Sequence, residues 1–205
     1  MELKEALAEL RKQEKCKFDQ SIDLIINLKG IDVKRDNIAT IVTIPHKIKD
    51  KKVCGFLTKK SDLVRTVTQP DFQKYKEKKP LKTLVKEYDF FIAAAPLMPS
   101  VATVFGKVLG PAGKMPSPQL GVLMKEDEAS IKQLIEKINN SVKIRVKEPS
   151  VKVSIGKESN KDSELTDNLN AIYQGLLNVL PTKKDNIKNI MIKTTMGKPL
   201  IVEMK

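Results

Sequence analysis

The stretch Phe18-Asp-Gln-Ser-Ile-Asp-Leu-Ile-Ile-Asn-Leu28 decides the fold. Ile22, Leu24, Ile26 and Leu28 occupy alternate positions, and we expect Phe18 to share their face. The intervening positions at 19, 21, 23 and 27 are polar. A period of two is typical of a β-strand with one buried face. The segment therefore predicts a sheet that is open to solvent on one side and covered on the other.

The neighbouring segments cannot cover that sheet alone. They provide a short amphipathic helix over 2–15 and a second strand over 38–44, which Pro45 ends. One helix and two strands are too few to bury a core. Residues 150–205 provide a strand at 151–155, a long helix with an apolar face from 165 to 180, and a hairpin of strands 187–195 and 200–204. We therefore expect 1–48 and 150–205 to form one discontinuous domain.

Residues 49–149 have a different pattern and are predicted to form an inserted domain. Short apolar strands at 53–57 and 90–95 alternate with helices at 80–88, 101–109 and 126–139, and a strand follows at 142–146. Ser61 and Asp62 are expected to open a further helix as N-cap residues. Alternating strands and helices predict an α/β unit with a mainly parallel sheet. The two chain crossings form the expected hinge, at Pro45, His46, Lys47, Pro149 and Ser150.

Composition restricts the class of protein. Of 205 residues, 40% are hydrophobic but only 4% aromatic, so the core must be mostly aliphatic. The longest apolar run, 90–98, has nine residues and is far shorter than the roughly 20 that span a bilayer. The N-terminus shows no apolar signal region, and Cys16 and Cys54 are not spaced as C-x-x-C. These features predict a cytoplasmic protein with no membrane partner.

The charge makes nucleic acid the first partner class to consider, although a solvated basic surface is the alternative. The 38 Lys and Arg exceed the 25 Asp and Glu by 13, and only four of the cations are Arg. Lys acts as a compact point charge toward phosphates, whereas Arg supplies the planar fork that reads guanine edges. Lys-rich binding favours folded RNA over sequence-specific DNA.

No catalytic or metal-binding group, and no cofactor site, is predicted. The single His46 has no cluster of Cys or carboxylates beside it and is interpreted as a surface or hinge residue. The Gly- and Pro-rich segment 106–121 fails the phosphate-loop pattern, because Val108 and Met115 replace its Gly and its Ser or Thr. Gly110-Pro-Ala-Gly113 matches the G-x-x-G of KH domains. Either a rigid structural loop or a contact loop fits this segment, whose candidate residues are Gly110, Gly113, Lys114, Met115 and Pro116.

The turn Thr194-Thr-Met-Gly-Lys-Pro199 is the second candidate for contact with a partner. We expect Gly197 to adopt a positive φ, and the neighbouring hydroxyls and Lys198 to meet RNA phosphates and 2′-OH groups. An ordinary hairpin turn fits the same residues.

Five segments, taken together and in order, resemble the large-subunit ribosomal protein L-one family in its archaeal form. They are Lys17-Phe-Asp-Gln-Ser21, Ile44-Pro-His46, Leu109-Gly-Pro-Ala-Gly-Lys-Met-Pro116, Ile155-Gly-Lys157 and Lys193-Thr-Thr-Met-Gly197. The resemblance implies a discontinuous α/β sandwich with a smaller, inserted Rossmann-like α/β domain. It implies a non-enzymatic protein that is a monomer outside the ribosome and binds large-subunit rRNA at the mobile stalk beside the exit site. Exit-site tRNA and its own mRNA, as a translational repressor, are the other implied partners.

The resemblance also implies RNA-contact residues. Strand parity adds Asn189 and Lys193 to the face of Thr195, and Lys198 follows in the turn, which gives the set Lys17, Phe18, Ser21, Lys157, Asn189, Lys193, Thr195, Met196, Gly197 and Lys198. Asn189 stands where the family has a small hydroxyl residue, and the link after His46 lacks the glycines of many relatives.

Charge is distributed unevenly over the expected domains. The net charge is +1 for 1–48, +9 for 49–149 and +3 for 150–205. We assign the main RNA site to the discontinuous domain, because local contacts determine specificity while net charge steers association. Two alternatives remain: a free regulatory RNA-binding protein, and an enzyme that uses the 106–121 loop for a phosphorylated metabolite.

Overall fold

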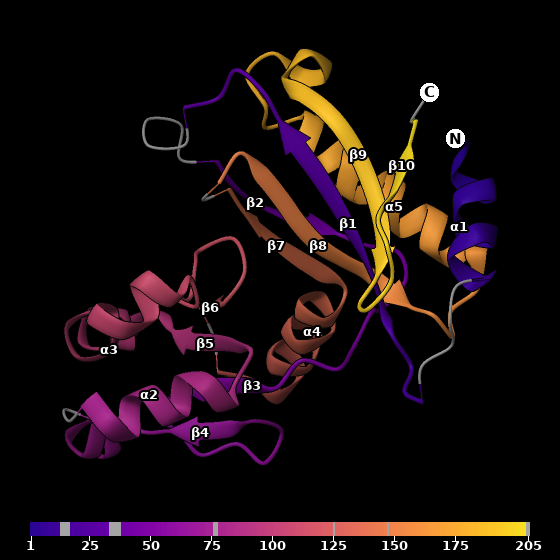
Figure 1. The fold of residues 1–205 in the computed structure, drawn as a ribbon. Coiled ribbons are helices and arrows are strands. Elements are labelled where there is room, and N and C mark those ends of the chain that lie inside the picture. The colour runs from indigo at the N-terminus through magenta and orange to yellow at the C-terminus, as the bar shows by residue number, and fades with distance from the viewer. Residues whose placement is uncertain (13–16, 33–37, 76–77, 125, 147, 204–205) are drawn as a thin grey trace. The chain divides into compact units, whose positions relative to one another are not determined.

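The computed structural model describes residues 1–205 except 13–16, 33–37, 76–77, 125, 147 and 204–205 (Figure 1). Cys16 and the predicted ends of the first helix and the last strand lie outside the described residues. The chain divides into two compact units. Unit 1 comprises Met1–Lys49 with Asn140–Lys205, and unit 2 comprises Asp50–Asn139. Both contain helices and strands, which confirms the α/β class.

Unit 1 is built on a four-stranded antiparallel sheet in the order β10-β9-β1-β8. The strands are β10 (Leu200–Val202), β9 (Ile187–Thr194), β1 (Ser21–Leu28) and β8 (Ser150–Lys157). Burial alternates along β1 as its sequence predicts. Phe18 is 55% exposed, so the expectation that it joins the buried face is wrong. It lies before the first paired residue, Ser21, and no sheet pairing imposes the alternation there.

Two helices cover the buried face of this sheet. The apolar sides of α1 (Leu3–Lys12) and α5 (Asp162–Leu177) belong to one aliphatic core with β1, β8 and β9. Gly156 on β8 permits this packing, because a Cβ there would lie 2.5 Å from Leu165 Cδ2 on α5. A short 3-10 helix, η3 (Lys183–Asn186), leads from α5 toward β9. On the opposite face, the side chains of β1 and β9 are half-buried rather than buried, and in Figure 1 no described helix of unit 1 lies over them. We call this the open face of the sheet.

The predicted domain boundary at 149–150 needs correction. A two-stranded antiparallel ribbon, β2 (Ala39–Thr43) and β7 (Ser141–Arg145), places the strand predicted in the insertion within unit 1. The second crossing therefore lies at 139–140. Pro149 and Ser150 are inside unit 1, where Leu28 N–H donates to Pro149 O and Ser150 opposes Asn27. They are therefore not at a crossing. The prediction was wrong because the local sequence shows the strand at 142–146 but not the strand with which it pairs.

The corrected boundary also changes the distribution of charge. Unit 1 contains 22 Lys and Arg against 15 Asp and Glu, a net charge of +7. Unit 2 contains 16 against 10, a net charge of +6. Lys49 and residues 143–148, which together carry a net charge of +3, belong to unit 1 and account for the difference between +9 and +6. Net charge therefore does not favour unit 2 as the main RNA-binding unit.

Unit 2 has a parallel sheet in the order β4-β3-β5-β6, as the strand–helix alternation predicts. The strands are β4 (Arg65–Val67), β3 (Val53–Phe56), β5 (Phe90–Ala94) and β6 (Val122–Leu123). The helices are η1 (Gln69–Tyr75), α2 (Lys78–Glu87), η2 (Ala95–Leu97), α3 (Met98–Ala112) and α4 (Glu128–Asn139). The helix expected at Ser61 is wrong: Ser61 N–H donates to Thr66 Oγ1 in a turn that leads into β4.

Four phenylalanines form the centre of unit 2, although aromatics are scarce in the chain. Ring centroids of Phe56, Phe72, Phe91 and Phe105 lie 4.6–5.9 Å apart in the contacting pairs. Burial raises the pKa of the nearby Cys54 thiol to about 12, so it is not a reactive thiolate at neutral pH. No helix in the described part of the chain is long and apolar enough to cross a membrane.

Candidate nucleic-acid interface

Three segments distant in sequence meet at one edge of the unit 1 sheet. Ser21 at the start of β1 opposes Lys157 at the end of β8, and Ile22 opposes Thr194 at the end of β9. The turn 195–199 follows β9 directly, and Figure 1 shows it in yellow beside the start of β1. Antiparallel pairing thus gathers six of the predicted contact residues at this edge: Ser21, Lys157, Thr195, Met196, Gly197 and Lys198. We call this edge, together with Lys17 and Phe18 just before β1 in the chain, the turn edge.

Thr195 is fastened to β1 by its backbone and its hydroxyl. Its N–H donates to Ser21 O at 3.0 Å. Its Oγ1 accepts from Ser21 N–H and donates to Ser21 O, both at 3.2 Å. The hydroxyl proton is therefore already used, while one lone pair remains. Toward a ligand, Thr195 can accept one further hydrogen bond but cannot donate without breaking its bond to Ser21.

Two side chains that were not among the predicted RNA-contact residues fix the rest of the turn. Met196 N–H donates to Gln20 Oε1 at 3.1 Å, and Gly197 N–H donates to Thr194 Oγ1 at 3.0 Å. Gln20 is 2% exposed. A polar residue on the inward parity of β1 was the sequence signal for it. Gly197 is not among the described glycines with positive φ, so that expectation is wrong; hydrogen bonds hold the turn instead.

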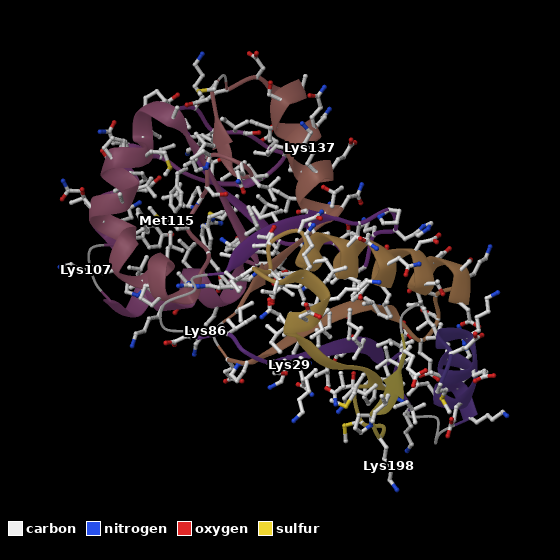
Figure 2. The ribbon with its side chains drawn as sticks, turned by 90° about the horizontal axis from the view of Figure 1, so that it is seen from above. Lys29, Lys86, Lys107, Met115, Lys137 and Lys198 are labelled. Atoms are coloured by element: carbon white, nitrogen blue, oxygen red, sulfur yellow. The ribbon has the colours of Figure 1, made fainter. Side chains whose placement is uncertain are left out.

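Large apolar side chains project from the turn edge. Met196 is 72% exposed and Phe18 55% exposed, in a chain that buries most of its other apolar residues. Lys198 is also exposed, and Figure 2 shows it extending away from unit 1 at the end of the turn. Exposed apolar surface beside cations and a rigid backbone is typical of a surface that binds a partner.

Lys157 is held by a carboxylate that the sequence analysis missed. Its Nζ lies 3.5 Å from Asp19 Oδ2, and Asp19 also accepts from Ser159 N–H at 3.2 Å and Ser159 Oγ at 3.0 Å. Desolvation raises the pKa of the Asp19 carboxyl, but the Ser159 bonds and the Lys157 ammonium outweigh it, so the pKa lies below its ordinary value. Both side chains remain partly exposed. Lys157 is thus oriented and charged at the surface.

Asn189 and Lys193 lie on the open face of the sheet, and Asn189 is remote from the turn edge. Lys193 opposes Asp23, and Asn189 opposes Asn27, whose Nδ2 donates to Asn189 Oδ1 at 2.7 Å. The alternation of β9 agrees with their predicted shared face. Six residues of strand separate Asn189 from Thr195, a distance of roughly 20 Å. The structure does not bring Asn189 together with the turn edge.

The first crossing is anchored to α5 before it leaves unit 1. His46 N–H donates to Asn168 Oδ1 at 3.0 Å, while Asn168 Nδ2 donates to His46 O and Ile155 O, both at 2.9 Å. His46 Nε2 lies 3.3 Å from Asp167 Oδ2. These bonds fix the position of His46. The other two predicted hinge residues of this crossing, Pro45 and Lys47, are its neighbours in the chain. Among the described residues no His, Cys, Asp and Glu group is arranged to hold a metal ion.

The glycine-rich segment of unit 2 has structural partners. Gly110 lies within α3, which runs past the expected end at Gly110-Pro111 and stops where Gly113 adopts φ +70°. Lys114 Nζ donates to Val85 O and Tyr88 O, both at 2.7 Å, and so satisfies carbonyls at the end of α2. Met115 is half-buried and Pro116 buried. The geometry favours the interpretation of this segment as a structural loop. Lys114 is held by backbone carbonyls, which argues against its use as a phosphate-binding lysine in the enzyme alternative.

Comparisons with known proteins match nearly the whole chain. A family model described as "Ribosomal protein L1p/L10e family" matches residues 10–198. "Large ribosomal subunit protein uL1" from Thermofilum pendens is 36% identical over 213 residues, which cover 98% of this chain and 90% of that protein. The proteins of the same name from Pyrobaculum islandicum and Pyrococcus horikoshii are each 32% identical, over 97% of this chain and 90% and 94% of theirs. A match of this extent shows that the chain belongs to the ribosomal protein L1p/L10e family, a family of structural ribosomal proteins rather than enzymes.

Proposed function

We propose that this protein is a component of the large ribosomal subunit and binds rRNA through the turn edge of unit 1. The observation that carries the proposal is the fixed turn 195–197, which exposes Met196 at the same edge of the sheet as Lys157 and the start of β1. Phe18, which precedes β1 in the chain, is exposed as well. Folded RNA offers ribose and base surface for the apolar side chains, phosphates for the lysine, and 2′-OH donors for the remaining lone pair of Thr195.

The rigidity of the turn supports recognition of shape. Four hydrogen bonds to Ser21 and Gln20 hold Thr195 and Met196 before any ligand arrives. Binding then loses little conformational freedom of the backbone, which improves affinity without adding contacts. A purely electrostatic surface would need neither the buried Gln20 nor a fixed turn.

The same site serves the finer parts of the proposal. In the subunit, the protein assists the release of deacylated tRNA at the exit site while unit 1 holds the rRNA stalk. When free, it represses translation by binding its own mRNA through the same turn edge. Motion between the two units at the crossings near 49–50 and 139–140 accompanies tRNA release.

The experiment is a footprint of the full-length protein on total RNA from its own cells, after crosslinking in intact cells. We expect large-subunit rRNA to dominate, with one protected stem region, and the protein to sediment with large subunits. A minor footprint on its own mRNA would support the repressor role, and contacts to tRNA the exit-site role. Recovery of mRNAs without rRNA would refute the proposal and favour the free regulatory protein.

A further inference from the structure

A second set of converging donors lies in unit 2, at the end of β3. Thr58 N–H lies 3.2 Å and 3.0 Å from the two carboxylate oxygens of Glu126, and Thr58 Oγ1 donates to Oε2 at 2.6 Å. Lys59 N–H points at the same oxygen, at 3.3 Å. We call these two backbone N–H groups and the hydroxyl the Thr58 cradle. All its bonds are at the exposed surface.

The Thr58 cradle occupies the position at which parallel sheets bind ligands. In the sheet, β4 lies next to β3 on one side and β5 lies next to it on the other. The direction in which strands are added therefore reverses between β3 and β5. Crevices outside the carboxyl ends of strands at such a reversal bind ligands in open α/β sheets. Thr58 lies two residues after the end of β3, and Glu126 comes from the segment after β6, reaching past the end of β5.

The occupant of the cradle is a surface carboxylate, and lysines lie beside it in the chain. Backbone N–H groups joined by a hydroxyl form concave anion sites that suit phosphate as well as carboxylate. Lys59 and Lys60 are exposed beside the cradle. Lys60 also lines a hollow of about 640 Å³, together with Arg65 and Lys74 and the carboxylates of Asp62 and Asp71. Lys74 Nζ lies 2.9 Å from Asp71 Oδ1, so Lys60 and Arg65 are the cations there that no ion pair with Asp71 occupies. The positive end of the α3 dipole, which has no side-chain cap, begins after β5 at the same edge of the sheet.

We propose that the Thr58 cradle is a second RNA contact of this protein, which binds a backbone phosphate when the Glu126 carboxylate moves out. Glu126 competes with the phosphate for the cradle, because its carboxylate accepts the hydrogen bonds of the donors in the free protein. Only a phosphate that also gains favourable contacts with the neighbouring lysines binds tightly enough to displace it. The choice of RNA as the source of the phosphate rests on the proposed function. The geometry of the cradle is independent of that proposal. Unit 2, which lacks the turn edge, has a net charge of +6, which favours association with RNA.

The test is an NMR titration of the full-length, isotope-labelled protein that follows the amide signals of Thr58 and Lys59. The probes are an eight-nucleotide polyuridine RNA and, separately, inorganic phosphate. Glu126→Gln removes the competing charge, and Glu136→Gln on the exposed side of α4 is the matched control. We expect the RNA to saturate both signals in Glu126→Gln at a concentration at least fivefold lower than in the wild type or in Glu136→Gln. Adding Thr58→Val should abolish most of this gain.

Two outcomes would overturn the proposal. One is that the two amide signals respond to the RNA equally in wild type, Glu126→Gln and Glu136→Gln, or in none of them. The other is that only inorganic phosphate moves them, which would make the cradle a small-anion site. Glu126→Asp, which keeps the charge on a shorter side chain, should tighten binding to an intermediate degree and replaces Glu126→Gln if that variant unfolds. The amide signal of Met196 in the same spectra reports the turn edge separately, so failure of one site is distinguishable from failure of the other.

Discussion

Met196→Ala separates recognition of shape from attraction of charge at the turn edge. The side chain is 72% exposed, so most of its apolar surface is available for burial by RNA. Burying a whole Met side chain is worth about 1.5–3 kcal/mol, and the exposed share of it corresponds to about 1–2 kcal/mol. That is roughly a five- to thirtyfold loss of affinity. The part already buried in the free protein amounts to less than about 1 kcal/mol of folding stability on the same scale.

The assay is fluorescence anisotropy with a labelled large-subunit stalk fragment at two or more salt concentrations. Met196→Ala removes no charge, so affinity should fall equally at every salt concentration and the slope of log K against log salt should not change. Ile201→Ala is the control, because Ile201 is a large apolar residue that is 58% exposed on β10, opposite Met191 and away from the turn. Wild-type affinity in Met196→Ala, with Ile201→Ala equally silent, would show that RNA does not cover the turn and would refute the placement of the site.

Three further changes test individual groups. Lys157→Ala should lower the salt slope by about 0.7–0.9, as expected for one lost phosphate contact; Lys161→Ala is the control, and an unchanged slope in the former would exclude Lys157 as a phosphate ligand. Lys114→Met should lower the free energy of unfolding of unit 2 by about 1–3 kcal/mol in urea, because carbonyls at the end of α2 lose their partner, and RNA affinity should not change. A loss of RNA affinity without a loss of stability would instead support the interpretation of 106–121 as a contact loop. Hydrogen bonds from Lys74 and Thr68 lower the pKa of Asp71 to about 2, below its ordinary 3.8, so its contribution to stability is present above that ordinary value and is lost as the pH falls toward 2. The stability difference between wild type and Asp71→Asn should therefore shrink between pH 4 and pH 2, and a constant difference would contradict this.

The sequence predicted what depends on local periodicity and composition. The two-residue period of β1 and the helical period of α5 gave the buried faces correctly, because burial of an apolar face follows from side-chain direction along a single element. Strand–helix alternation gave the parallel sheet of unit 2. The motifs gave the family, and the excess of lysine indicated an RNA-binding protein before any coordinates.

Errors arose where the answer depended on a partner. The strand at 141–145 was placed in the insertion because its apolar pattern does not show that it pairs with β2. Phe18 follows the parity of β1 but lies beyond its paired residues, so it is exposed. Gly197 was expected to need a positive φ, whereas the Thr194 hydroxyl and Gln20 hold the turn.

By itself, the sequence determined the element types, the charge and the family of this protein. Only the tertiary structure decided which groups meet: Thr195 with Ser21, 174 residues apart, Lys157 with Asp19, and Glu126 with Thr58. The physical reason is that periodicity is set within one helix or strand, whereas hydrogen-bond partners are set by the register between strands and by the order of strands in a sheet. With the same sequence, a shift of one residue in the pairing of β1 with β9 would turn every side chain of one strand to the other face. The groups of the turn edge would then no longer meet.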